Sequence, residues 1–313
     1  MDWNDAHLFL AVARTGQMLA AARRLGISQA TLSRRVAALE SDLGQALLVR
    51  QAHGCALTET GLALAERLER VEAEMIRAEE ITERGAARLT GTVRVGAPDG
   101  FGIAFLASRL ERFASRHPEL VFQLVPVPRA FSLSEREADL AVLVGQPAGH
   151  RLVVRKLTDY TLSLYGARHY LEQFGEPRSL DGLTTRHRLI GHVDDLVYAP
   201  GLNYTRDLVR NWQSALEISG AVAQVAAVQG GAGIGVLHDY IAQPVPELVR
   251  ILPEIVATRS YWIAYHENLR NTARVQAVVK FLTEIVREAR QDFLPYDVAD
   301  APPAAVRTDA DRD

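Results

Sequence analysis

A stretch of hydrogen-bonding side chains near the start of the chain has the composition of a nucleic-acid contact. These side chains are Ser28, Gln29, Thr31, Ser33, Arg34 and Arg35. Glutamine pairs with adenine, and arginine pairs with guanine or phosphate, in the major groove of DNA. The sequence from Ala6 to Leu39 contains five arginines and no acidic residue, so phosphates would meet no repelling carboxylate there. The stretch therefore predicts contacts with duplex DNA.

The surrounding residues predict helices that would position this stretch. Apolar residues at helical spacing indicate helices over residues 5–15 and 17–25, and Gly26 then allows a tight turn. Ser28 is a favourable N-cap for a third helix over residues 29–43. Two helices joined by a turn of about three residues are typical of a helix-turn-helix motif, here at about residues 17–36. A trihelical module that binds protein would show similar spacing and is the alternative.

Two short strands are expected after the third helix, at residues 47–49 and 56–58. The loop between them would form a wing with its tip near His53 and Gly54, within reach of the DNA backbone or minor groove. A winged helix-turn-helix domain, all-α apart from this small wing, is therefore expected over residues 1–59.

A long helix is expected next, as a linker over residues 60–89. Its apolar residues repeat at 4-3-4-3 spacing, which is typical of a coiled-coil seam between two subunits. The repeating residues are Leu64, Leu68, Val71, Met75 and Ala78. An amphipathic helix that packs on its own domain would show the same repeat. Gly85 and Gly91 would end the helix and form a hinge.

Strands and helices alternate over residues 92–290. The expected strands are 92–97, 121–127, 139–144, 161–166, 215–219, 233–237 and 261–266, and the expected helices are 103–116, 222–229 and 272–290. This alternation is typical of parallel sheets with both faces covered by helices. It predicts an α/β domain of two subdomains, the first at about 92–160 and 266–290 and the second at about 161–265. Ligands of such folds bind at strand ends, in the cleft.

The charge of the chain is unevenly distributed. The net charge is −3, and residues 297–313 account for all of it with five aspartates and two arginines. This segment also contains Pro302, Pro303 and few large apolar residues, so a disordered acidic tail is expected over residues 291–313. The rest of the chain sums to zero, which excludes a protein that coats nucleic acid through bulk charge.

Other classes of protein are disfavoured by what the sequence lacks. The single cysteine, Cys55, permits no internal disulfide, and neither a signal peptide nor a membrane-spanning run is found. A cytoplasmic protein without membrane contact is expected. An enzyme and a solute-binding protein remain as alternatives. The nine histidines are scattered without metal-ligand spacing, and Cys55 lies in the expected wing, so neither a catalytic set nor a metal site is predicted.

The first sixty residues resemble the N-terminal domain of LysR-type transcriptional regulators. Matching positions at fixed spacing are Ala21-Ala22, Leu25, Ser28-Gln29, Ser33-Arg34, Leu39-Glu40, Leu43-Gly44, Leu47, Arg50, Leu57-Thr58 and Gly61. Family members often have Ser-Phe-Thr where this chain has Gln17-Met18-Leu19, and a basic residue where it has His53 or Ala56. The DNA-binding residues implied by the resemblance and the pattern together are Arg23, Ser28, Gln29, Thr31, Leu32, Ser33, Arg34, Arg35, Arg50, His53 and Thr58.

The later part resembles the effector-binding domain of the same family, so the resemblance covers about residues 1–290. Its landmarks are Val95-Gly96, Phe113, His117-Pro118, Glu137 to Ala141 and Gly230 to Val236. The resemblance implies two Rossmann-like subdomains of the type 2 periplasmic-binding-protein fold, with a small-molecule effector between them and no cofactor. It also implies a homodimer through the linker helix, with Leu64, Leu68, Val71 and Met75 at the interface, a homotetramer, and RNA polymerase as a further partner.

The effector cleft is expected at the loop after residues 92–97, which holds Pro98, Asp99, Gly100 and Phe101, together with Pro128. His192 and Asp194 are expected opposite this loop. Each has a simpler interpretation, since Asp99 could cap the following helix, His192 could be an ordinary histidine, and Asp194 could be solvated. Many family members have Ser or Thr in the loop to hold a carboxylate. Asp99 instead favours a ligand with an amine or hydroxyl group, or no ligand.

Overall fold

The computed structural model describes residues 1–51, 54–83, 89–127, 138–147, 151–196, 202, 204–209 and 211–296. The first domain contains helices α1 (Trp3–Thr15), α2 (Met18–Leu25) and α3 (Gln29–Leu43) and the antiparallel strands β1 (Leu48–Gln51) and β2 (Gly54–Leu57). The Ser28 hydroxyl accepts a hydrogen bond from the Thr31 amide at 3.1 Å and caps α3, as predicted. Gly26 has the left-handed φ of 67° that ends α2 and allows the tight turn. Phe9, Leu32 and Leu39 form the centre of the core.

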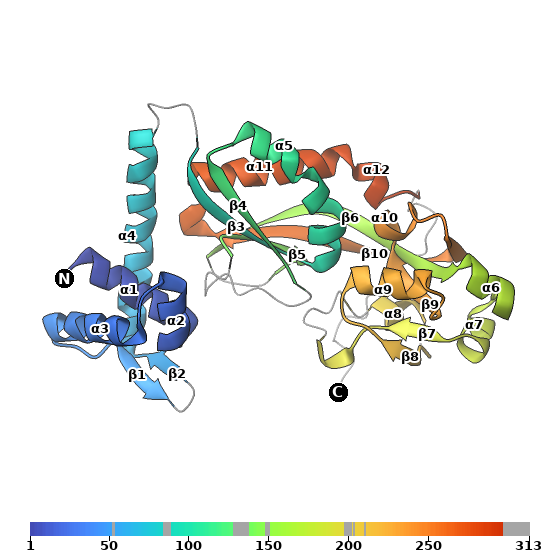
Figure 1. Cartoon of the computed structure of the whole chain (residues 1–313), viewed down its shortest axis with the longest axis horizontal. Helices are drawn as coiled ribbons and strands as arrows, with labels where there is room; N and C mark the ends of the chain where they lie inside the picture. Colours follow the sequence, from blue (N-terminus) through green and yellow to red (C-terminus); the bar gives the residue numbers. More distant parts are fainter. Residues whose placement is uncertain are drawn as a thin grey trace, which may run out of the picture.

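The linker helix α4 (Glu59–Glu83) extends away from this domain (Figure 1). Leu68 is only 2% exposed and lies in the core of the first domain, and Leu64 packs against the same core. Val71 and Met75, further along, are 44% and 45% exposed. The predicted seam therefore has two parts. Its first turns pack on their own domain, as in the alternative interpretation, and its later turns face outward.

The described part of the second domain contains one eight-stranded sheet with the order β4-β3-β5-β10-β6-β9-β7-β8. The strands are β3 (Gly91–Ala97), β4 (Leu120–Pro126), β5 (Leu140–Val144), β6 (Leu152–Ala167), β7 (Leu189–Gly191), β8 (Ser214–Glu217), β9 (Ile234–His238) and β10 (Leu248–His266). Strands β3, β4 and β5 form the first subdomain, and β7, β8 and β9 form the second. Each set is parallel within itself, and β6 and β10 connect the two sets (Figure 1).

The prediction of parallel pairing alone is wrong for β6 and β10. These strands pair antiparallel with each other, and they also pair antiparallel with β9 and β5 respectively. One strand carries the chain from the first subdomain to the second and the other carries it back, so their directions must be opposite. The predicted boundary at residue 266 is also too late. Tyr261–Tyr265 already pair with β5 of the first subdomain.

Helices cover the sheet. In the first subdomain they are the π-helical turn η1 (Gly100–Leu106), η2 (Ala107–Arg109), α5 (Leu110–Arg116) and α11 (Ala273–Glu288). In the second they are α6 (Arg168–Phe174), α7 (Leu180–Arg186), η3 (Asp194–Leu196), α8 (Tyr204–Leu208), α9 (Ala221–Gln229) and α10 (Asp239–Ala242), and the short turn η5 (Glu267–Leu269) follows β10. The single helix predicted over 103–116 is thus three pieces. The wider π turn places both Phe101 and Phe105 in the core.

The predicted tail starts too early. Helix α12 (Arg290–Phe293) follows α11, and the Phe293 side chain is completely buried. Its ring lies 4.6 Å from that of Phe105 in the first subdomain and 4.7 Å from that of Tyr240 in the second. The Arg250 guanidinium also lies 3.7 Å from the Tyr296 ring centre. The packing of these aromatic side chains stabilises an ordered structure in this segment, although its overall composition is polar. Residues 297–313 lie outside the described part of the chain.

Candidate nucleic-acid interface and ligand cleft

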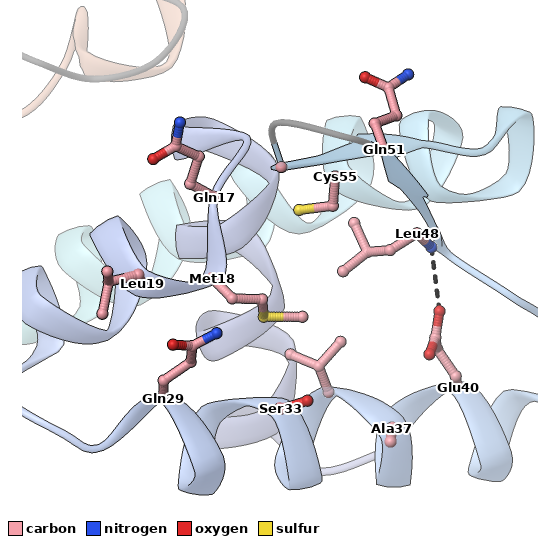
Figure 2. A pocket seen from close by; sticks show the side chains of 12 residues that line it. Gln17, Met18, Leu19, Gln29, Ser33, Ala37, Glu40, Leu48, Gln51 and Cys55 are labelled. Atoms are coloured by element: carbon pink, nitrogen blue, oxygen red, sulfur yellow. Dashed lines mark hydrogen bonds between the residues drawn. The ribbon is translucent and has the colours of Figure 1, made fainter.

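A groove of about 680 Å³ runs between α3 and the wing (Figure 2). Gln29 and Ser33 line it from α3, and Gln51 and Gly54 line it from the wing. The start of α2 closes one side with Gln17, Met18 and Leu19. The groove therefore brings together the start of the predicted recognition helix, the start of α2 and the wing.

Most of the predicted polar residues lie at the surface. Arg23, Ser28, Gln29 and Arg34 are exposed, and Ser33 is partly exposed. The Ser28 and Thr31 hydroxyl oxygens are 2.9 Å apart, so these two side chains are oriented by each other at the start of α3. The side chain of Arg50 and the whole of His53 lie outside the described part of the chain.

Three residues of the predicted DNA-binding set have structural roles. Leu32 is completely buried in the core, so the prediction that it contacts DNA is wrong. The Arg35 guanidinium forms an ion pair with Asp5 and lies 3.8 Å from Asp2, which joins α3 to α1. The Thr58 hydroxyl donates to the Ala46 carbonyl at 2.8 Å and accepts from the Gly61 amide at 2.9 Å, so it caps α4.

Glu40 positions the wing, a role that the sequence did not indicate. Its carboxylate accepts hydrogen bonds from the backbone amides of Leu47 at 2.7 Å and Leu48 at 3.0 Å (Figure 2). Both bonds are accepted by the same carboxylate oxygen, and they join α3 to the first wing strand. A single glutamate inside an otherwise regular helix gave no signal of this contact.

The second candidate site is a cavity of about 20 Å³ between the two subdomains. It is lined by Pro98, Asp99, Gly100, Val144, His192, Leu202, Tyr204, Gly220, Ala221, His238 and Tyr261. A cavity of this size holds about one water molecule. A larger ligand would therefore need this cavity to widen.

Asp99 bridges the two subdomains. Its Oδ2 accepts a hydrogen bond from the Val222 amide at 3.1 Å, in the first turn of α9. It forms no side-chain hydrogen bond that caps its own helix, so the simpler interpretation of Asp99 as a local cap is wrong. Gly220, which precedes α9, has a φ of 93°, and a Cβ there would lie 2.9 Å from Asp99 Oδ2. Glycine at this position leaves room for the carboxylate.

The other predicted cleft residues have mixed outcomes. Pro98, Gly100 and His192 line the cavity with Asp99, and His192 Nδ1 lies 3.2 Å from the Val193 carbonyl. Phe101 is completely buried and its ring packs 5.1 Å from that of Tyr261, so it belongs to the core behind the cleft. Asp194 is exposed and is not among the lining residues. Pro128 lies outside the described part of the chain.

His238 is a cleft residue that the sequence analysis missed. Its imidazole is 5% exposed and stacks on Tyr160 with ring centres 5.1 Å apart. Burial lowers the pKa of His238 to about 3, so the imidazole is neutral at physiological pH. A signal was present, because His238 directly follows the predicted strand 233–237 and ligands bind at the carboxyl ends of such strands.

The described residues offer neither a metal site nor a membrane-spanning helix. They contain no group of three or more His, Cys, Asp or Glu side chains that could hold a metal ion. Among the described helices, none combines the length and the hydropathy needed to cross a membrane.

Comparison with known families identifies both domains. Residues 3–62 match the family model described as bacterial regulatory helix-turn-helix protein, lysR family. Residues 86–287 match that of the LysR substrate binding domain. The chain belongs to the LysR family. It is therefore a DNA-binding transcriptional regulator with an effector-binding domain, and the predicted fold class and function are confirmed. The relatives of this LysR-family chain are regulators and not enzymes, and nothing supports the alternatives.

Individual relatives agree with the family. The transcriptional activator TtdR of Escherichia coli K12 is 26% identical over 284 residues, which cover 89% of this chain and 91% of TtdR. A transcriptional regulator of Xanthomonas campestris is 34% identical over 182 residues, and this alignment spans about half of that protein, 53%, and 58% of this chain.

Solved structures of the family share the fold. The regulator CrgA of Neisseria meningitidis has a TM-score of 0.56 and 24% identity, and the match covers 91% of this chain and 98% of CrgA. Full-length CbnR in complex with its target DNA has a TM-score of 0.52 and 20% identity, with 92% and 100% of the chains covered.

Proposed function

We propose that this regulator binds its operator by placing the start of α3 in the major groove, with Gln29 and Arg34 as the main contacts. Both side chains are exposed, and Gln29 lies in the groove that α3 shares with the wing. Gln29 is suited to an adenine edge, and Arg34 to guanine or phosphate. Arg23, Ser28, Thr31 and Ser33 add contacts around them, and Arg50 and His53 are assigned to the wing by family resemblance.

In the same proposal two copies pair through the outward part of α4, where Val71 and Met75 are exposed. A two-fold dimer presents two copies of α3 to two half-sites, and pairs of dimers form a tetramer. The known complex of CbnR with its target DNA shows that a protein of this fold binds DNA. The regulator would act on RNA polymerase in the cytoplasm, the compartment that holds bacterial DNA.

The effector is proposed to bind between the subdomains, at the cavity that contains Asp99, His192 and His238. A ligand that binds the separated form better than the closed form shifts the population between them. The assembly then changes how its DNA-binding domains are placed, which links the cleft to the operator.

Operator binding is tested with a DNA duplex that the wild-type protein selects from a random-sequence pool. We expect Gln29→Ala to lose about 1–3 kcal/mol of binding free energy and to relax the preference at one base. Arg34→Ala should weaken binding to all sequences and lower the salt slope by about one if it contacts phosphate. Gel-shift titrations at several salt concentrations measure both effects.

The control is Arg168→Ala, which removes an exposed arginine at the start of α6 in the effector domain. It removes the same charge from the chain far along the sequence from α3, so it should bind the duplex like the wild type. If Gln29→Ala and Arg34→Ala also bind like the wild type, α3 is not the recognition helix.

A further inference from the structure

The cleft contains a carboxylate that belongs to the protein itself, in a place suited to an anion. Asp99 Oδ2 accepts the Val222 amide at 3.1 Å at the start of α9, and α9 has no side-chain cap of its own because Gly220 precedes it. The amides at the start of a helix are unsatisfied donors with partial positive charge and favour an anion. Asp99 supplies that anion from the opposite subdomain.

The described part of the lining has no permanent cation that could balance a second negative charge. Among the described lining residues, Asp99 is the one carboxylate, and there is no lysine or arginine. A ligand carboxylate would therefore lie close to Asp99 in a desolvated space without a compensating cation, which is strongly unfavourable.

His238 gives an independent indication of the ligand. Its side chain is buried and lines the same cavity as Asp99. Burial keeps its pKa low, so the ring offers one donor and one acceptor and no positive charge. A neutral imidazole is suited to a hydroxyl, amine or amide group.

We propose that Asp99 permanently occupies the anion position of the effector cleft, so that this regulator excludes carboxylate effectors and accepts uncharged or cationic ones with hydrogen-bonding groups. This inference rests on the proposed role of the cleft as the effector site. Opening of the cleft separates Asp99 from Val222, and a hydroxyl or amine on the ligand can then bond to Asp99 and His238 in place of the lost contact.

Chemical rescue with acetate tests this assignment. Asp99→Ala removes the carboxylate and leaves space for an acetate ion at the start of α9. In the full-length protein, sodium acetate should raise the Tm of Asp99→Ala by about 2–4 °C relative to sodium chloride at equal ionic strength, once acetate is about tenfold above its Kd. The wild type should show no such difference between the two salts.

Asp99→Asn is the matched control. It keeps the size of the side chain and an oxygen that can accept the Val222 amide, so it fills the position and should not respond to acetate. Asp99→Ser serves as a second cavity-forming variant if Asp99→Ala does not fold. An equal acetate response in the wild type would overturn the inference, because carboxylates then bind despite Asp99. No response in any folded cavity-forming variant would overturn it too.

Failure of the proposed function gives a different result. If the chain is not an operator-binding regulator, the wild type selects no DNA duplex, whatever acetate does to the Tm. If only the inference is wrong, the wild type still binds the selected duplex while the acetate pattern fails.

Discussion

The His238 imidazole is held neutral by its surroundings. It is buried between the subdomains, where it stacks on Tyr160, and Tyr204 and Tyr240 approach it edge-on at ring-centre distances of 6.1 and 5.7 Å. Protonation would place a charge in this aromatic environment, and burial therefore lowers the pKa of His238 to about 3, from 6.5. This shift links the stability of the chain to pH.

The direction of the linkage follows from the two pKa values. As the pH falls below 6.5, the unfolded chain takes up a proton at residue 238 and the folded chain does not, until pH about 3. The contribution of His238 to stability is therefore complete above pH 6.5 and is lost progressively below it. We expect the stability difference between wild type and His238→Phe to change by about 1.4 kcal/mol per pH unit below pH 6. Urea unfolding at pH 7, 6 and 5 measures it.

The variant His238→Phe keeps a ring for stacking and removes only the titrating group. His169→Phe, at an exposed position in α6, controls for the general effect of replacing a histidine. Wild type and His238→Phe curves that stay parallel over this pH range would contradict the buried neutral state of His238.

Individual residues also show where sequence reasoning succeeded and failed. Ser28, Gln29 and Arg34 were placed correctly at the surface start of α3, because the cap and the helical period are local properties. The same period assigns Leu32 to the core, although Leu32 was included among the predicted DNA contacts. His192 and Asp99 do line the same cavity. Tyr204 and Tyr261 were missed, because their approach depends on long-range packing.

At the scale of elements, an ion pair joins the first domain to the linker helix. Arg14 of α1 forms two hydrogen bonds with Glu72 of α4, at 3.2 and 2.7 Å, and the two side chains are 9% and 11% exposed. His7 Nε2 also lies 3.6 Å from Glu72. Together with Leu68, this pair sets the direction in which α4 leaves the domain.

A double-mutant cycle tests the pair. Arg14→Met and Glu72→Leu should each lower the free energy of unfolding, by less than the roughly 3–5 kcal/mol of an isolated buried pair. The loss is smaller because Glu69 still lies 3.9 Å from Arg14 and His7 still lies 3.6 Å from Glu72. The double variant should regain most of that loss, since both charges are then absent. Urea unfolding followed by circular dichroism gives the three values.

The exposed ion pair between Arg116 of α5 and Glu284 of α11 provides the comparison. Replacing both of its members should show little coupling, because solvent screens an exposed pair. If the Arg14 and Glu72 substitutions are simply additive, the two side chains do not act as a buried pair.

The helices with strong local signals were predicted well, and elements held by distant pairing were not. Ser28 and Gly44 mark the ends of α3 in the sequence, and its bounds agree with the structure. Strands β6 and β10 are longer than expected. Their pairing with each other extends over residues where polar side chains interrupt the alternation of apolar and polar residues, so the sequence pattern did not show the full length. Helix α12 was missed because the acidic and proline-rich residues after it dominate the composition.

At the scale of the whole molecule, two large apolar side chains are exposed in the outward part of α4, among the residues whose burial the structure describes. These are Val71 and Met75. We expect Val71→Glu with Met75→Glu to raise the dimer dissociation constant roughly 100-fold or more, because burial of both side chains is lost in both copies. Light scattering after size exclusion measures the mass, and operator affinity should fall with it.

Leu180→Glu in α7 introduces a glutamate at an exposed leucine elsewhere in the chain and should leave the mass unchanged. If the α4 double variant keeps the mass of the wild type, α4 does not form the dimer interface.

The two long strands between the subdomains also have a mechanical consequence. Strands β6 and β10 pair with each other from Leu248 and Ala167 at one end to His266 and Leu152 at the other, with two irregularities, between Ile251 and Val256 and between Tyr261 and Trp262. Such a ladder resists bending within its plane but yields to a change of twist. At its far end, Arg151 lies 3.2 Å from Glu66 of α4. Separation of the subdomains would therefore twist this pair of strands and act on the contact with α4. The resistance of the two strands to twisting would then set how strongly ligand binding affects DNA binding.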